Sequence, residues 1–382
     1  MEEKAEEIKV ALAHDFLVDW GGAEETLAAL AEIYPTAPIY TLIFDREKIG
    51  SRGEWLKNRV VRESFLGRMP NFLKRRKKWL LPFLPTAPET FDLRDFDLVI
   101  SSSGGFVKSL VVKSKTLHFC YLHSPLRYVW DWSREYLEEN RLKGRSKILV
   151  RLFLNYLRLW DRSSAQRPDY FLANSWYTAQ RIEKYYHRKS AVIYPPVKLE
   201  DFSPQKRHQG YFLTVARLSA YKRMDLLIEV FHKLNLPLKI VGQGVEEKRL
   251  AKKIQESGRK NVQLLGWVER KDLVKLYENC RAFILAAEED FGIVMVEALA
   301  AGKPVIALNQ GGAKEIIKEG ENGILFDYAE LELIADGVRR FIEQEDKFDC
   351  NQIRQTAEKF SWQRFQTEIV NFIQEKTTTV KQ

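Results

Sequence analysis

The sequence predicts an α/β protein built from two doubly wound domains. Three observations support this prediction. The chain of 382 residues exceeds the size of one ordinary domain. Short apolar runs alternate with amphipathic stretches along it, and a proline-rich break divides the alternation into two series. Alternation of this kind is typical of parallel sheets with helices on both faces.

The strands are expected where a short apolar run is bounded by polar residues. The first series places them at residues 8–13, 97–101, 117–122, 170–173 and 191–194. The second series places them at residues 211–215, 238–241, 262–265, 282–286 and 304–307. Helices are expected at residues 22–33, 175–186, 224–234 and 272–278, and a last one from residue 362.

The break between the series lies at Pro195 and Pro196, which end a strand and precede a polar stretch at residues 200–210. We therefore expect one domain at residues 1–197 and a second at residues 198–361, facing each other across a cleft. A C-terminal helix, 362–382, is expected to pack back on the first domain. Ligands of such folds bind beyond the carboxyl ends of the strands, so residues that follow strands carry the most information.

Composition excludes several classes of protein. The chain is 45% hydrophobic and 30% charged, as globular proteins are. Its cysteines, Cys120, Cys280 and Cys350, are too few and too scattered for a disulfide framework or a cysteine zinc site. No apolar stretch reaches the roughly 20 residues that span a bilayer, and the acidic N-terminus does not resemble a signal peptide. We expect a cytoplasmic protein.

The charge is uneven. Residues 51–200 hold 29 Lys and Arg against 14 Asp and Glu, whereas residues 201–382 hold 28 against 27. Such asymmetry predicts an anionic partner for the first half: nucleic acid, a membrane surface or a phosphorylated substrate. Two basic stretches with interspersed apolar residues, Lys74 to Lys78 and Arg141 to Arg162, favour the membrane surface. The alternative, that both are amphipathic helices packed on their own domain, stays open.

The most informative segment is residues 286–305, which predicts a strand, an acidic loop with a glycine, a helix and a further strand. The amides of Phe291, Gly292 and Ile293 at the helix start would form an anion site. Glu289 and Glu297 stand eight residues apart, one on the loop and one on the helix. Carboxylates suit a sugar ring and a ribose, because they accept paired hydrogen bonds from diols.

This pair of glutamates, followed by Gly302-Lys303-Pro304, closely resembles the motif of the retaining family-four glycosyltransferases, which have the two-Rossmann-domain GT-B architecture. The likeness reaches from about residue 8 to about residue 375. It implies transfer of a hexose from a nucleotide sugar with retention at the anomeric carbon, the leaving phosphate acting as base. It also implies that Glu289 holds sugar hydroxyls and Glu297 the ribose diol.

The resemblance makes residues 1–197 the acceptor-binding domain and residues 198–361 the donor-binding domain, and it assigns further donor-binding residues. Arg217 and Lys222 follow the first strand of the second domain and would clamp the diphosphate, as their charge suits. The loops that end the next two strands resemble the nucleoside-binding turns of the family, at Gly242, Gly244, Gly266, Trp267 and Val268.

In the first domain, the resemblance places the helix start at Gly21 and Gly22 near the donor phosphates, and His123 beside the sugar. The expected catalytic residues are thus Glu289, His123, Arg217 and Lys222. Residues 14–16, 37–42 and 123–131 look most like bacterial surface-polysaccharide mannosyltransferases. This likeness implies GDP-mannose as donor and a glycan or lipid-linked sugar as acceptor.

Asp95-Phe96-Asp97 fits the Asp-x-Asp pattern of metal-dependent glycosyltransferases, but it leads directly into a strand. Because Arg217 and Lys222 would neutralise the diphosphate, we expect no metal and no other cofactor. Three alternatives stay open: a UDP-sugar-dependent transferase of the same fold, a nucleotide-sugar 2-epimerase, and a basic nucleic-acid-binding protein, although no binding module for nucleic acid is present.

Overall fold

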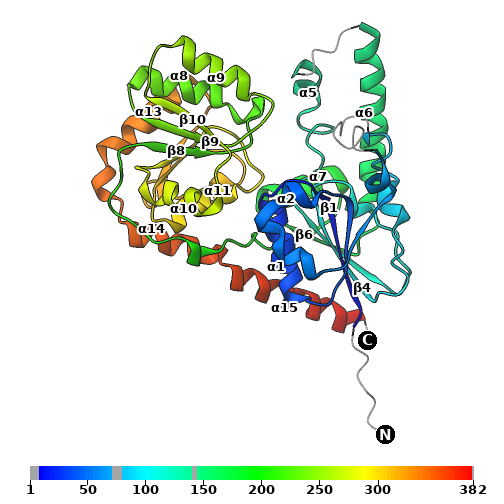
Figure 1. Ribbon diagram of the computed structural model, residues 1–382. Coiled ribbons are helices and arrows are strands. Elements are labelled where there is room, and N and C mark those ends of the chain that lie inside the picture. The colour runs from blue at the N-terminus through cyan, green and yellow to red at the C-terminus, as the bar shows by residue number, and fades with distance from the viewer. Residues whose placement is uncertain (1–7, 71–79, 140–143, 381–382) are drawn as a thin grey trace. The chain divides into compact units, whose positions relative to one another are not determined.

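The computed structural model describes residues 8–70, 80–139 and 144–380 (Figure 1). The chain forms two compact units: unit 1 ends at Pro195 and resumes at Phe365, and unit 2 is Pro196–Arg364. The basic stretch from Lys74 to Lys78 lies outside the described residues, as does Arg141 at the start of the second stretch.

Unit 1 contains a seven-stranded sheet in the order β3-β2-β1-β4-β5-β6-β7. All neighbouring strands run parallel. The strands are β1 (Val10–Leu17), β2 (Ile39–Phe44), β3 (Val61–Glu63), β4 (Leu98–Ser103), β5 (Leu117–Leu122), β6 (Tyr170–Ala173) and β7 (Ser190–Val192). The order reverses between β1 and β4, so the loops that follow these two strands leave toward opposite sides.

The helices of unit 1 are α1 (Gly22–Ile33), α2 (Arg46–Ile49), α5 (Ser133–Glu139), α6 (Gly144–Ser164) and α7 (Trp176–Tyr186). The C-terminal helix α15 (Trp362–Val380) packs its later part against unit 1. Its Phe365 contacts Tyr121 and its Phe372 contacts Phe119, both edge to face on β5.

Unit 2 contains a six-stranded parallel sheet in the order β10-β9-β8-β11-β12-β13, which reverses between β8 and β11. The strands are β8 (Phe212–Val215), β9 (Leu238–Val241), β10 (Val262–Gly266), β11 (Phe283–Leu285), β12 (Val305–Leu308) and β13 (Gly323–Phe326). The helices are α8 (Met224–Leu234), α9 (Glu247–Glu256), α10 (Arg270–Asn279), α11 (Ile293–Ala300), α12 (Ala313–Ile316), α13 (Leu331–Glu343) and α14 (Cys350–Ala357).

The prediction of two doubly wound α/β sheets with a C-terminal helix is confirmed. Sequence reasoning overlooked three strands, β2, β3 and β13. The run Ile39–Phe44 is apolar except for Thr41, and periodicity alone does not distinguish such a buried strand from a helix segment. The other two are short: β3 has three residues at the sheet edge, and β13 begins at a glycine.

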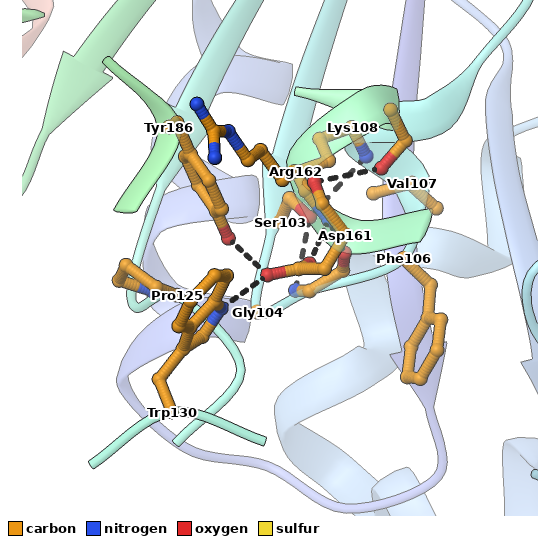
Figure 2. Close-up of polar contacts among 12 residues, drawn as sticks. Ser103, Gly104, Phe106, Val107, Lys108, Pro125, Trp130, Asp161, Arg162 and Tyr186 are labelled. Carbon is orange, nitrogen blue, oxygen red and sulfur yellow. Dashed lines mark hydrogen bonds and ion pairs between the residues drawn. The ribbon is translucent and has the colours of Figure 1, made fainter. Parts of the chain in front are cut away.

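A fully buried ion pair fixes the long helix α6 to the loop that follows β4. The Lys108 ammonium lies 2.6 Å from Asp161 Oδ1, and both side chains are completely buried. Figure 2 shows Trp130 and Tyr186 pointing at the same carboxylate, to which they donate hydrogen bonds of 2.7 and 2.8 Å. Lys108 also donates to the carbonyl oxygen of Gly105 and stacks over the Trp160 ring. Every charge in the cluster is therefore compensated, as burial requires.

We predict that Lys108→Met destabilises unit 1 by about 3–5 kcal/mol, because it leaves the buried Asp161 carboxylate without its counter-charge. Lys113→Met, at an exposed lysine on the same connection, is the matched control and should change stability by less than about 0.5 kcal/mol. Urea unfolding followed by tryptophan fluorescence measures both. Coincident midpoints for the two variants would contradict the prediction.

Candidate functional site

The loop between β11 and α11 carries Glu289, the first of the two glutamates that the sequence singled out. Glu289 is partly buried, Phe291 is buried, and α11 begins directly after Gly292. The first amides of this helix, starting at Ile293, carry the positive end of its dipole, and the Met295 amide donates to the Gly292 carbonyl oxygen at 2.9 Å. This loop therefore combines an anion-binding helix start with an adjacent carboxylate.

Two glycines that follow β12 hold the acidic loop in place. The Gly312 amide donates a 2.9 Å hydrogen bond to the Glu289 carbonyl oxygen. A Cβ atom on Gly312 would lie 2.2 Å from the Phe291 carbonyl oxygen, and one on Gly311 would lie 2.2 Å from that of Glu289. Only glycine allows this close approach of two backbones. Sequence reasoning overlooked both positions, although a Gly-Gly pair soon after a strand could have indicated them.

Lys222 and Glu289 form an ion pair across the reversal of strand order in unit 2. Lys222 ends a short turn after β8, and Glu289 follows β11, the neighbouring strand across the reversal. The side chains are 8% and 18% exposed, so solvent screens the pair only partly. The sequence assigned both residues to the donor site, and the structure brings them together.

Arg217 lies on the same loop as Lys222, with an exposed side chain. The loop after β9 crosses beneath it, where Gly242 has a φ of 138° and a Cβ atom would lie 1.9 Å from the Ala216 carbonyl oxygen. Gly244 makes a similar approach to Leu218. These two glycines thus support the Arg217 loop by close packing.

Glu297 lies inside unit 2, held by two residues of α10. Its carboxylate pairs with Arg270 and accepts a 2.9 Å hydrogen bond from the Tyr277 hydroxyl. Arg270 also pairs with Asp201 at 3.0 Å. Burial, together with the neighbouring carboxylate, raises the pKa of Tyr277 well above its usual value, so its hydroxyl stays a donor. A carboxylate has about four acceptor positions, so Glu297 keeps capacity for a further ligand.

Arg270, Tyr277 and Asp201 were not anticipated. Arg270 and Tyr277 stand seven residues apart and share one face of α10, a spacing that could have indicated a common partner. Of the nearby predicted residues, Gly266 ends β10, Trp267 is 62% exposed and Val268 is partly exposed. The Gly266 carbonyl oxygen accepts from the Gly242 amide at 2.8 Å, which joins the two turns.

In unit 1, the predicted residues gather at the reversal between β1 and β4. Gly21 caps α1, Gly22 is its first residue, and the Gly21 amide donates to Glu24 Oε2 at 2.8 Å. His123 follows β5, and its Nε2 lies 2.8 Å from the Ser102 hydroxyl. The Asn174 side chain donates to the His123 carbonyl oxygen at 2.9 Å.

Asp15 ties the loop after β4 to the end of β1. Its carboxylate accepts hydrogen bonds from the amides of Gly104, Phe106 and Val107 at 2.5, 3.0 and 2.7 Å. Burial raises its pKa, and the amide hydrogen bonds act in the opposite direction. This carboxylate therefore has a structural task in shaping the loop.

Asp97, the second aspartate of the Asp-x-Asp pattern, lies where β4 begins and accepts a 3.1 Å hydrogen bond from the Lys9 amide. It lies at the end of the sheet where β4 begins, whereas His123 lies at the opposite end, where β5 finishes. Within residues 8–70, 80–139 and 144–380, no group of three or more His, Cys, Asp or Glu is arranged to hold a metal ion. No helix in these ranges is long and apolar enough to cross a membrane.

Comparison with known proteins identifies the family. The model of "Glycosyltransferase Family 4" matches residues 20–201, and that of "Glycosyl transferases group 1" matches residues 196–360. Together these matches span nearly the whole described chain. The chain belongs to glycosyltransferase family 4, a family of retaining enzymes, as the acidic motif predicted.

Individual relatives are distant. A glycosyltransferase of Methanocaldococcus jannaschii, MJ1607, is 34% identical over 42% of this chain and 43% of its own length. O-antigen chain mannosyltransferase C of Escherichia coli is 26% identical over 50% of this chain and 53% of its own length. The chain thus spans about half the length of the curated relatives it matches.

Solved structures confirm the GT-B fold. HepE of Anabaena, crystallised with UDP, superposes with a TM-score of 0.71 over 96% of this chain and 100% of its own, at 19% identity. Sucrose-phosphate synthase of Thermosynechococcus elongatus gives a TM-score of 0.76 over 97% of this chain and 100% of its own, at 16% identity.

We predict that Gly312→Ala destabilises unit 2 by about 1–3 kcal/mol, because the added methyl group would displace the acidic loop. Gly337→Ala is the matched control: Gly337 lies inside α13, and the nearest atom to its new Cβ would be 3.4 Å away. The control should be neutral or gain up to about 1 kcal/mol, since alanine favours the helix. Urea titration of the two variants checks this, and equal stability would refute the proposed contact.

Proposed function

We propose that this chain transfers a hexose from a nucleotide sugar to a glycan or lipid-linked sugar acceptor, with retention at the anomeric carbon. The observation that carries the proposal is the Lys222–Glu289 pair, set beside the start of α11 at the strand-order reversal of unit 2. Ligands of doubly wound folds bind at such a reversal. A diphosphate would meet cations and helix amides there, and a sugar would meet a carboxylate.

Each residue then has a distinct task. Lys222 and Arg217 stabilise the departing diphosphate, and the amides of Phe291, Gly292 and Ile293 assist them. Glu289 accepts hydrogen bonds from sugar hydroxyls. Glu297, oriented by Arg270 and Tyr277, grips the ribose diol. The exposed Trp267 and the turns at Gly242, Gly244, Gly266 and Val268 receive the nucleoside.

The reaction follows from retention without an enzyme nucleophile. The acceptor hydroxyl oxygen bonds to the anomeric carbon on the face from which the diphosphate departs. The glycosidic C–O bond to the diphosphate breaks, its electron pair stays with phosphate, and that phosphate oxygen takes the acceptor proton. The resemblance to the family assigns Gly21 and Gly22 to the phosphates and His123 to the sugar. Because Lys222 and Arg217 stabilise the leaving group, no metal ion is needed.

We propose GDP-mannose as the donor. The E. coli relative is a mannosyltransferase, and the first half of the chain resembles surface-polysaccharide mannosyltransferases. UDP-glucose is the competing donor, because HepE was crystallised with it. The family assignment favours a nucleotide-sugar donor of either kind over the alternative of a nucleic-acid-binding protein.

The donor is tested by thermal stability with GDP-mannose, GDP, UDP-glucose and UDP. A ligand at a hundred times its Kd stabilises by about 2.7 kcal/mol, and we expect this for GDP-mannose and GDP, unchanged by EDTA. Glu297→Ala should weaken protection by GDP, whereas Glu289→Ala should keep it and lower kcat, because its partner is the reacting sugar. Glu256→Ala, on the exposed face of α9, is the control.

If UDP stabilises the protein and GDP does not, the donor is a UDP-sugar and the assignment of GDP-mannose is wrong. Protection by neither nucleotide, or normal protection and turnover in both glutamate variants, would reject the site. Loss of activity with EDTA and its rescue by manganese would reject the metal-free reaction.

We further propose that the enzyme works on the cytoplasmic face of a membrane, through α6. This helix projects beyond the sheet of unit 1 (Figure 1). Its buried side faces the core with Leu154, Leu157 and Asp161. The opposite side presents five apolar residues that are each more than half exposed: Ile148, Leu149, Leu152, Tyr156 and Leu159. An apolar stripe of this kind suits the interfacial region of a bilayer.

Cations line the side of α6 that carries the buried Leu154, away from the apolar stripe. A pocket of about 490 Å³ between α5 and α6 is lined by Arg134, Lys147, Arg151 and Arg158. Its other lining residues, Ser133, Leu137, Leu154 and Asn155, carry no charge. In this proposal the cations attract anionic lipid to α6 by their charge, and the apolar stripe on the other side of the helix enters the interface. Lys74 to Lys78 would add to the attraction.

Vesicle flotation tests this placement. We expect binding to vesicles that contain anionic lipid, little binding to neutral vesicles, and loss of binding with added salt. Leu149→Ser with Leu152→Ser should weaken it through the stripe, and Lys147→Gln with Arg151→Gln through the charge. Lys113→Gln with Lys115→Gln removes the same charge at exposed positions outside α6 and is the control. Equal flotation of all variants would end the assignment to α6.

A further inference from the structure

A continuous chain of hydrogen bonds links α1 to the proposed sugar-binding histidine. Glu24 Oε1 lies 3.4 Å from His14 Nε2, and His14 Nδ1 lies 3.1 Å from the Ser102 hydroxyl. The same hydroxyl lies 2.8 Å from His123 Nε2. His14 and Ser102 are register partners on β1 and β4, with exposures of 2% and 0%. The middle of this hydrogen-bond series, His14 and Ser102, is thus built into the sheet and shielded from water.

The Glu24 carboxylate determines which group donates and which accepts in each of these hydrogen bonds. A carboxylate can only accept, so His14 Nε2 must carry a hydrogen. With His14 in its neutral form, the one N–H is on Nε2, so Nδ1 accepts and the Ser102 hydroxyl donates to it. The Ser102 oxygen, having used its only hydrogen, accepts from His123 Nε2–H. In neutral His123 the remaining nitrogen, Nδ1, is left with a lone pair.

We propose that Glu24, His14 and Ser102 are positioning residues that hold His123 in its Nε2–H tautomer, so that Nδ1 presents a hydrogen-bond acceptor to a substrate hydroxyl. The substrate contact rests on the proposed function, whereas the tautomer does not. Burial lowers the pKa of His123 to about 3, so the ring is neutral at ordinary pH. Among the described residues Nδ1 has no hydrogen-bond partner, and His123 is partly exposed.

The second carboxylate oxygen of Glu24, Oε2, allows the relay to be tested by a single substitution. It accepts from the Gly21 amide at 2.8 Å, at the capped start of α1. In Glu24→Gln this amide claims the only side-chain oxygen, which turns the glutamine NH₂ toward His14. His14 Nε2 must then accept, Nδ1 becomes the donor to Ser102, and the serine donates to His123. The tautomer of His123 should therefore switch from Nε2–H to Nδ1–H through three hydrogen bonds.

The experiment is ¹⁵N NMR of the full chain labelled at histidine, in which the pyridine-type and pyrrole-type ring nitrogens have separate signals. The six histidines are assigned by single substitutions. We expect the pyridine-type signal of His123 at Nδ1 in the wild type and at Nε2 in Glu24→Gln. Glu25→Gln removes the same charge one residue away, where the carboxylate accepts from Trp20, and should leave the tautomer unchanged.

Ser102→Ala is the second variant, because it removes the hydroxyl that links His14 to His123 without altering Glu24. His123 should then show a mixture of both tautomers. An Nδ1–H tautomer in the wild type, or one tautomer common to the wild type, Glu24→Gln and Ser102→Ala, would overturn the relay.

A kinetic readout separates the relay from the function. If His123 contacts the sugar, Glu24→Gln should lower kcat/KM by about fivefold, the order of one hydrogen bond, and Glu25→Gln should not. A switched tautomer in a protein that binds no nucleotide sugar would support the relay and reject the proposed function. An unswitched tautomer in a Glu24→Gln enzyme that keeps its activity would support the proposed function and reject the relay.

Discussion

The feature on which both units depend is the reversal of strand order at the carboxyl edge of each parallel sheet. Where the order reverses, the loops after the two central strands turn toward opposite faces and leave polar backbone exposed between them. In unit 1 this position lies between β1 and β4, and in unit 2 between β8 and β11. Side chains from across each reversal meet there: His14 with Ser102, and Lys222 with Glu289.

Polar groups at this edge are buried and must therefore be paired, which explains the density of hydrogen bonds around β4. This strand ends in three buried serines, each of which bonds a neighbour: Ser101 to His118, Ser102 to two histidines, and Ser103 to the amides of its own loop. Asp15 closes the same loop from β1. The Lys108–Asp161 pair extends the network to α6, so the projecting helix and the loop after β4 share one buried cluster (Figure 2).

The sequence was a good guide where the signal is local. Apolar runs located most strands, and the Glu289–Glu297 spacing indicated both the family and the loop at the start of α11. Side-chain partners that are distant in the sequence could not be predicted in this way. Nothing near Glu297 indicates that Arg270 and Tyr277 will hold it, and nothing near His123 indicates Ser102 or Glu24. Such pairings depend on which strands and helices become neighbours, and this is decided by tertiary packing.

The two glutamates of the motif share a property that explains why acids can flank an anion site. Each is already paired with a cation in the protein by itself, Glu289 with Lys222 and Glu297 with Arg270. A carboxylate left alone beside the helix start would repel a diphosphate, whereas a paired one adds little net charge and keeps free acceptor positions for hydroxyl groups. In the site that we propose, Lys222 turns toward a phosphate while Glu289 turns toward the sugar, so that this one ion pair would prepare both halves of the nucleotide-sugar site.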